Sequence, residues 1–232
     1  MLFMAVIRNF AMSPGEISSI RPLPPGAAWM SCHFSDSGIC DIPAALPEGS
    51  LLILDDSVPL QNQQPQKILS QLTEAIGRLH CQALLLDLQR PGNPRVPELA
   101  DLLTRGLPCP VGISEPYGQA TEGPVFLPLL PAHRCLSDWV APWNGREIWL
   151  EVGPAPEAAR VTAAGTRFEK APSPLPDCPH RHEKLLCHYG ISLGDNEIRF
   201  TLYRSSEDLK DLTAAAEALG VTRTVGLYQE LF

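Results

Sequence analysis

Basic residues are scarce in this sequence of 232 residues. It has 18 lysines and arginines against 26 aspartates and glutamates, a formal net charge of −8, and the basic side chains do not cluster. Proteins that bind nucleic acid or an anionic membrane surface present a basic patch to it. We therefore expect neither nucleic acid nor a membrane as a partner.

A segment of membrane-spanning length is also missing. The apolar run at residues 1–7 is broken by Arg8 and has no basic region before it, so it is too short for a signal peptide or a membrane span. The seven cysteines form an odd, scattered set. With no export signal, reduced thiols are the natural interpretation, and the sequence predicts a cytoplasmic protein.

Several motifs that carry chemistry are absent. There is no G-x-G-x-x-G or G-x-x-x-x-G-K-[ST] sequence for nucleotides, no G-x-S-x-G elbow and no H-E-x-x-H. The densest Cys/His cluster, formed by Cys178, His180, His182 and Cys187, matches no common zinc spacing. A polar loop that leads into a strand burying Cys187 is the simpler interpretation. We expect no cofactor and no metal, and the role of this cluster stays open.

Short apolar runs recur through the chain, with helical periods between several of them. Most runs are continuous rather than alternating, as expected for parallel strands covered on both faces. Apolar residues at spacings of three and four predict the helices, and Gly220 fits a helix stop. We expect strands at 2–7, 28–34, 51–54, 83–88, 110–114, 125–130, 147–152, 197–203 and 222–228, and helices at 65–80, 97–107 and 206–219.

This alternation predicts βαβ units in an α/β fold. Eight or nine strands favour a closed (β/α)8 TIM-type barrel over the second choice, an open doubly wound sheet. Residues 35–50 are too few for a helix and both loops, so the barrel is expected to be compact with some helices short or missing. We expect a single domain over residues 1–232, in which the Pro-, Ala- and Thr-rich stretch 160–184 is an irregular excursion.

The segment 82–89, Gln-Ala-Leu-Leu-Leu-Asp-Leu-Gln, resembles the strand motif D-x-x-D-x-D-x-E of family 18 glycoside hydrolases, the chitinases and their relatives. The four motif positions fall on Gln82, Leu85, Asp87 and Gln89. Segments 189–210 and 219–231 are similar to the late hairpin, strand and helix and to the last strand of that family, with Tyr228 nearest to its usual Trp. The M-x-Y-D element of strand six has no match.

The resemblance implies a mechanism in which the N-acetyl carbonyl of the substrate is the nucleophile and one protein acid protonates the leaving group. In the family, the neighbouring motif Asp, here Asp87, raises the pKa of that acid. The position of the acid is occupied by Gln89, whose amide has no proton to give. General-acid assistance, typically ~10²–10⁴-fold, would then be absent.

Other acidic residues end apolar runs, and active sites of α/β barrels lie at the carboxyl ends of the strands. Asp55 and Asp56 follow the third run, but adjacent residues point in opposite directions and only one can face a pocket. Glu115 or Glu151 could pair with Asp87 as relocated catalytic carboxylates. The alternative for each is a loop cap or an ion-paired charge at the rim.

Three functions therefore stay open. The first is a catalytically degenerate barrel, a pseudoenzyme that binds a carbohydrate or related small molecule. The second is an active glycoside hydrolase that uses Asp87 with Glu115 or Glu151. The third is an interaction or scaffold protein. The expected ligand-binding residues are Asp55, Asp56, Asp87, Gln89, Arg90, Tyr117, Tyr203, Tyr228 and Gln229.

Overall fold

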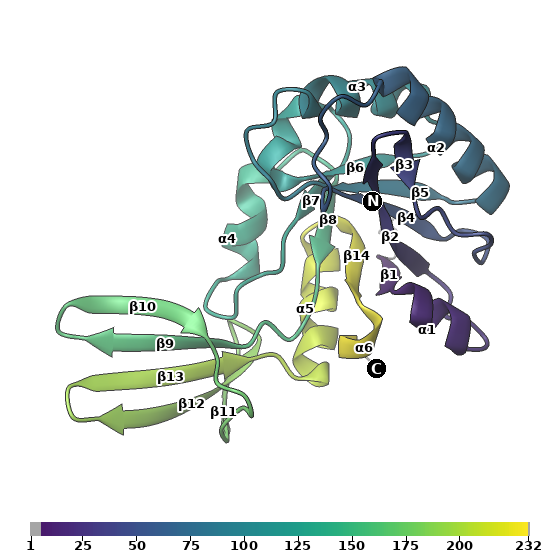
Figure 1. Cartoon of the computed structure of the whole chain (residues 1–232). Helices are drawn as coiled ribbons and strands as arrows, with labels where there is room; N and C mark the ends of the chain where they lie inside the picture. Colours follow the sequence, from purple (N-terminus) through teal and green to yellow (C-terminus); the bar gives the residue numbers. More distant parts are fainter. Residues whose placement is uncertain (1–5, 232) are drawn as a thin grey trace.

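A closed barrel of eight parallel strands forms the centre of the computed structural model, which describes residues 6–231 (Figure 1). Strand β1 pairs in parallel with both β14 and β2, which closes the sheet. The predicted (β/α)8-type barrel is confirmed, and the open sheet is wrong. The barrel strands are β1 (Ile7–Met12), β2 (Ala27–Ser35), β4 (Leu51–Asp55), β5 (Ala83–Asp87), β6 (Val111–Ser114), β7 (Val125–Leu127), β8 (Ile148–Glu151) and β14 (Val221–Leu227).

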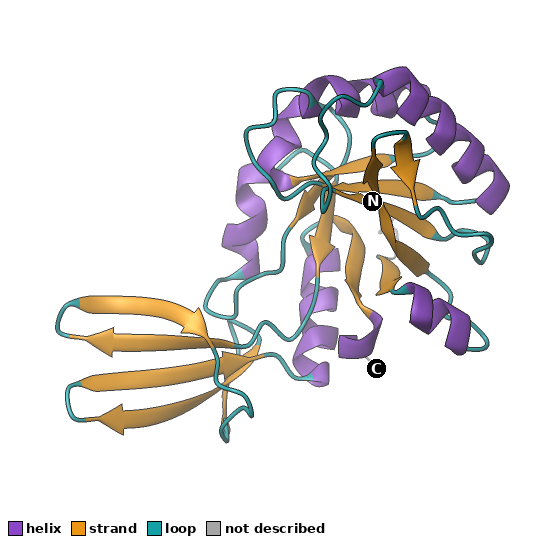
Figure 2. Ribbon diagram, viewed as in Figure 1, coloured by secondary structure: helices purple, strands orange, loops and turns teal. Residues whose placement is uncertain are grey.

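Three long helices pack on the outside of the barrel, at the places that the periodicity predicts: α2 (Pro65–Leu79), α3 (Val96–Gly106) and α5 (Ser206–Ala218) (Figure 2). The buried face of α2 carries Ile68, Leu72 and Ile76, and His80 ends the helix in a left-handed conformation. The remaining helical segments are short: α1 (Pro14–Ser19), η1 (Glu115–Ala120), α4 (Leu136–Val140), η2 (Ala141–Trp143) and α6 (Tyr228–Leu231).

The connection between β2 and β4 contains no helix within its described residues, as its length predicts. It holds the short strand β3 (Gly38–Cys40), which pairs antiparallel with β2. Within residues 6–231, no helix combines the length and the apolar character that crossing a membrane requires.

Two expectations about strands need correction. The first strand is Ile7–Met12 rather than 2–7, and residues 1–5 lie outside the described part of the chain. The strand expected at 197–203 exists, but as β13 (Glu197–Tyr203) in a second, antiparallel sheet. The fourth parallel strand of the barrel is β5, so the motif segment lies on strand four, as the resemblance implies.

The stretch 160–184 is irregular only in part, over residues 171–179, and the expectation is wrong for the remainder. It contributes to β9 (Glu157–Thr162), β10 (Gly165–Lys170) and β11 (His180–His182). With β12 (Cys187–Gly194) and β13 these strands form a five-stranded sheet in the order β10-β9-β13-β12-β11. The sheet is inserted between β8 and α5 and projects from the barrel (Figures 1 and 2). Its exposed hairpin strands lack the continuous apolar runs by which the barrel strands are recognised.

A buried carboxylate joins the inserted sheet to the barrel helix α5. Asp208, fully buried on α5, accepts hydrogen bonds from Arg181 Nε on β11 at 2.9 Å and from the Ser205 backbone N–H at 2.9 Å. His188 Nδ1 on β12 lies 2.6 Å from Asp208 Oδ2. Burial alone would raise the pKa of Asp208, but these hydrogen bonds outweigh burial and lower the pKa to about 2.

Asp208→Asn is expected to lower the free energy of unfolding by about 2 kcal/mol at pH 7, since the shift from 3.8 to about 2 is linked to stability. Because the pKa of Asp208 is lower in the folded protein than in the unfolded chain, its ionised carboxylate stabilises the fold at pH values above the unfolded pKa. The wild type should therefore lose this contribution as the pH falls from about 4 to 2. Urea unfolding at each pH measures it. The control Asp211→Asn removes only an exposed partner of Arg181, and equal losses in both variants would contradict the role of Asp208.

The lower part of the barrel interior is filled by one large side chain beside very small ones. Trp149 on β8 is fully buried, and a Cβ at Gly112 on β6 would lie 2.4 Å from its ring. The Arg223 guanidinium lies 4.8 Å from the centroid of the Trp149 ring and donates to Asn9 Oδ1 at 2.6 Å. These contacts close the barrel below its mouth.

Gly112→Ala is expected to destabilise the protein by about 1–3 kcal/mol, because the added methyl group overpacks the interior against Trp149. Gly77→Ala on α2 is the matched control. Its added Cβ meets no atom within 4 Å, so it should stabilise the helix by roughly 0.5–1 kcal/mol. Thermal and urea unfolding measure both variants, and a neutral Gly112→Ala would show that the ring can move away.

Candidate site at the mouth of the barrel

A cavity of about 140 Å³ lies at the carboxyl ends of the barrel strands. Three carboxylates reach it from three different strands: Asp55 ends β4, Asp87 ends β5 and Glu151 ends β8. The rest of the wall is mostly apolar. The other lining residues are Ala11, Met30, Ile53, Leu85, Phe126, Val225, Gly226 and Leu227.

Asp87 is held in place by two side chains. Its Oδ1 accepts a hydrogen bond from Gln89 Nε2 at 2.5 Å and one from Ser114 Oγ at 3.2 Å. Desolvation by burial raises the pKa of Asp87, and the hydrogen bonds from Gln89 and Ser114 only partly oppose that effect. Gln89 itself is exposed and does not line the cavity, so its amide acts on the site through Asp87.

Glu151 is the second carboxyl group in the cavity whose pKa is raised. Burial raises its pKa, the backbone N–H of Leu129 donates to it at 3.0 Å and opposes the rise, and the negative charge of Asp87 adds to the rise. Glu151 and Asp87 therefore share one low-dielectric pocket in which their charges repel. Such pairs are suited to acid–base chemistry or to donating a hydrogen bond to a ligand.

Asp55 and Asp56 face different surroundings, as their adjacency predicts. Asp55 lines the cavity and also accepts the Ser57 N–H at 2.8 Å. The Asp56 carboxylate accepts the backbone N–H groups of Gln89 at 3.2 Å and Arg90 at 2.8 Å. Asp56 thus ties the loop after β4 to the loop after β5, which fixes the chain that follows Asp87.

The other expected site residues do not line this cavity. Glu115 is exposed on η1. Tyr117 is buried, and its hydroxyl donates to the Arg90 carbonyl at 2.5 Å and accepts from the Asn93 N–H at 3.0 Å. Tyr203 stacks on His188 in the inserted sheet. Tyr228 and Gln229 belong to α6.

Sequence reasoning missed Ser114 and the apolar walls formed by Met30, Phe126 and Leu227. Ser114 carried a usable signal, because it ends a strand next to the motif strand. Met30 and Phe126 had none, since both read as ordinary core residues. The cluster of Cys178, His180, His182 and Cys187 does not converge; the Cys178 thiol instead donates to the Pro176 carbonyl at 3.4 Å.

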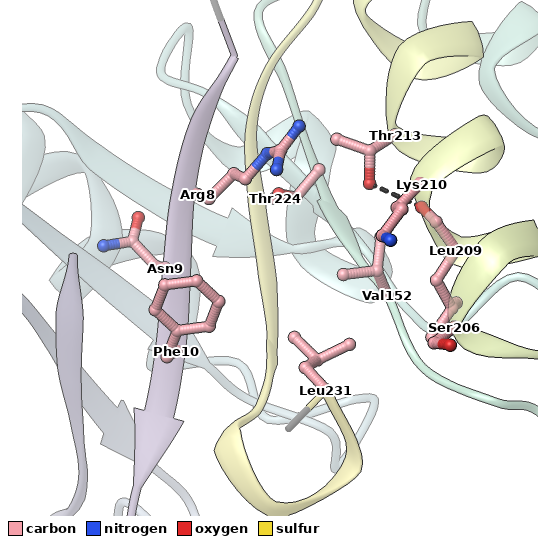
Figure 3. A pocket seen from close by; sticks show the side chains of 10 residues that line it. All are labelled: Arg8, Asn9, Phe10, Val152, Ser206, Leu209, Lys210, Thr213, Thr224 and Leu231. Carbon is pink, nitrogen blue, oxygen red and sulfur yellow. Dashed lines mark hydrogen bonds between the residues drawn. The ribbon is translucent and has the colours of Figure 1, made fainter. Parts of the chain in front are cut away.

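A larger hollow, of about 200 Å³, lies outside the barrel wall between β1, β14 and α5. In Figure 3, Arg8 and Lys210 reach toward it from opposite sides, and Thr213 and Thr224 lie between them. None of its described lining residues is acidic. It is separate from the strand ends, so it does not belong to the site that the motif segment forms.

No family model matches this chain, and no curated protein matches it either. Solved structures do match. A GH18 chitinase from Cycas revoluta in complex with (GlcNAc)3 has a TM-score of 0.60 at 9% identity, over 97% of this chain and 96% of that one. The spore cortex-lytic enzyme SleL of Bacillus cereus has a TM-score of 0.58 at 7% identity, over 98% of this chain and 72% of that one. A chitinase from Chromobacterium violaceum has a TM-score of 0.55 at 9% identity, over 96% of this chain and 93% of that one.

These likenesses establish the fold. The chain has the TIM-barrel architecture of GH18 chitinases, as the resemblance of the motif strand implies, although sequence identity is 10% or less in the structures compared.

Glu151→Gln is expected to make the protein more stable than the wild type at neutral pH, and the difference should shrink as pH falls. A carboxyl whose folded pKa is raised binds its proton more tightly when folded, so wild-type stability falls as pH rises from about 4.5 through the folded pKa. The amide keeps an acceptor for Leu129. Urea unfolding from pH 4 to 8 measures the trend, and Glu122→Gln, at an exposed position, should show none.

Proposed function

We propose that this protein binds a carbohydrate at the mouth of the barrel and lacks the acid of a family 18 hydrolase. One observation carries the proposal. The pocket joins carboxylates from three strand ends, while the residue at the acid position, Gln89, donates its amide N–H to Asp87. The fold shared with chitinases supports a sugar as the class of ligand.

The chemistry of the pocket suits a sugar. Asp55 and Asp87 offer carboxylate oxygens to hydroxyl or amide N–H groups, and Phe126, Met30 and Leu227 offer apolar surface to the faces of a ring. The cavity of about 140 Å³ is smaller than the ~300–1,000 Å³ of sites for drug-sized ligands. It would therefore hold one terminal sugar unit, or its acetamido group, rather than a long stretch of polymer.

The loss of the acid has a specific consequence for catalysis. A glutamate at position 89 would lie beside Asp87, whose raised pKa lets it share a proton with a neighbouring carboxyl. The amide of Gln89 cannot take part in that exchange, although it preserves the hydrogen bond. Substrate could then be bound and oriented while its leaving group goes unprotonated.

Gln89→Glu is expected to create or increase hydrolysis of aryl N-acetylglucosaminides and short N-acetylglucosamine oligomers, by up to the ~10²–10⁴-fold of general-acid catalysis. Gln66→Glu is the matched control, because Gln66 is exposed on α2 outside the barrel. Calorimetric titration of the wild type with the same oligomers measures binding, which Asp87→Ala should abolish. A wild type that neither binds nor hydrolyses any of these sugars would contradict the proposal and favour a scaffold.

An active hydrolase is the second candidate, favoured by the raised pKa of Glu151 in the same pocket as Asp87. Glu151 would then be the relocated acid, while exposed Glu115 lies outside the cavity. The two functions separate cleanly in the wild type. Turnover that is lost in both Glu151→Gln and Asp87→Ala would support the relocated pair and refute the degenerate site.

A further inference from the structure

Three potential metal ligands converge on the hairpin of β2 and β3. A ring nitrogen of His33, the Cys40 sulfur and a carboxylate oxygen of Asp41 all lie within 4.8 Å of one another. In the described part of the chain this is the one group of three or more His, Cys, Asp or Glu side chains with such proximity. The Nδ1 atom of His33 is 3.7 Å from Asp41 Oδ2.

The backbone explains why these side chains meet. His33 and Cys40 are direct partners in the antiparallel pairing of β2 with β3, and side chains of such partners share one face. Adjacent residues of a strand would point apart, but Asp41 has left the strand and has a φ of +56°. This left-handed turn brings the carboxylate to the same side as the Cys40 thiol.

Backbone carbonyls hold the cluster in place, and the Cys40 thiol donates to the His33 carbonyl at 3.6 Å. The Trp29 indole N–H donates to the Asp41 carbonyl at 2.7 Å, which anchors the left-handed residue. His33 Nδ1 lies 3.1 Å from the Ser31 carbonyl, and metal-bound histidines commonly donate their second ring nitrogen to such an acceptor. The same Nδ1 atom lies 3.7 Å from Asp41 Oδ2, so the Ser31 carbonyl fixes the orientation of the ring next to Asp41.

The donor set selects the kind of ion. Imidazole and thiolate with one carboxylate suit zinc or a similar transition metal, whereas magnesium and calcium require oxygen ligands. Tetrahedral coordination at ordinary Zn–N, Zn–S and Zn–O lengths puts ligand atoms roughly 3.3–3.6 Å apart. The present separations, up to 4.8 Å, require the side chains to close by about 1 Å, with no change in the strand pairing.

We propose that His33, Cys40 and Asp41 form a site for a zinc-like divalent ion at the rim of the barrel mouth. Three protein ligands leave a fourth position for water or another group, as in zinc sites that are open to ligands. His33 pairs in register with Asp55, which lines the mouth cavity, so the ion would lie beside that cavity. The site does not depend on the proposed carbohydrate function.

Cobalt(II) is the probe, because thiolate coordination gives a near-ultraviolet charge-transfer band and four-coordination gives intense visible bands. The fully reduced whole protein is titrated with CoCl₂. We expect one equivalent to bind with both signatures and zinc to displace it. Asp41→Asn should weaken binding by more than the ~10–100-fold that follows loss of an outer-shell partner, and asparagine tolerates the positive φ of this position.

Cys40→Ser should remove the charge-transfer band altogether, while the matched control Cys135→Ser, at another partly exposed cysteine, should retain it. Circular dichroism confirms that each variant is folded. The proposal is overturned if the reduced wild type gives no thiolate band at millimolar cobalt. It is equally overturned if the band persists at full strength in Cys40→Ser and Asp41→Asn, since the ion would then be bound by other thiols.

Discussion

Closure of the parallel sheet through β1 is the constraint on which the site depends. Because β1 pairs with β14 on one side and β2 on the other, every strand end is brought to one circular rim. Residues that are far apart in sequence, such as Asp55 and Glu151, then line a single cavity. In an open sheet the same side chains would lie along an edge, and their charges would not share one desolvated volume.

The interior below that rim is what makes the carboxylates unusual. Trp149 and Arg223 are buried in contact with each other in the lower barrel. Burial on one side and solvent on the other leaves Asp87 and Glu151 ionisable but reluctant to ionise. The packing of a large ring against Gly112 therefore matters for the chemistry of the mouth as well as for stability.

The fold was predictable from the sequence where local signals were strong. The continuous run at 83–86 and the spacing of Ile68, Leu72 and Ile76 define β5 and α2 without any knowledge of the rest. The inserted sheet was missed because β10 is exposed along its whole length and lies next to a proline-rich stretch. Strand β10 is held by its pairing with β9, and β9 by its pairing with β13, and no local sequence pattern reveals these pairings.

The membership of the site was harder to predict, since it depends on where a side chain turns after its strand ends. Glu115 follows β6 by one residue, and the 3-10 turn of η1 directs it to solvent, whereas Glu151 is still within β8 and faces inward. Tyr117 looks like a stacking residue in sequence, yet its hydroxyl is used to hold the loop at Arg90 and Asn93.

The three carboxyl groups at the mouth also set the electrostatic field there. A recess with low-dielectric walls focuses the field of the charges that line it, and the whole chain adds a net charge of −8. On the proposed function, this field would disfavour uronic acids, sulfated glycans and sugar phosphates, and it would extend about 10 Å at ordinary ionic strength. If this site binds sugars as proposed, its negative charge would favour neutral or amino sugars over acidic ones as ligands.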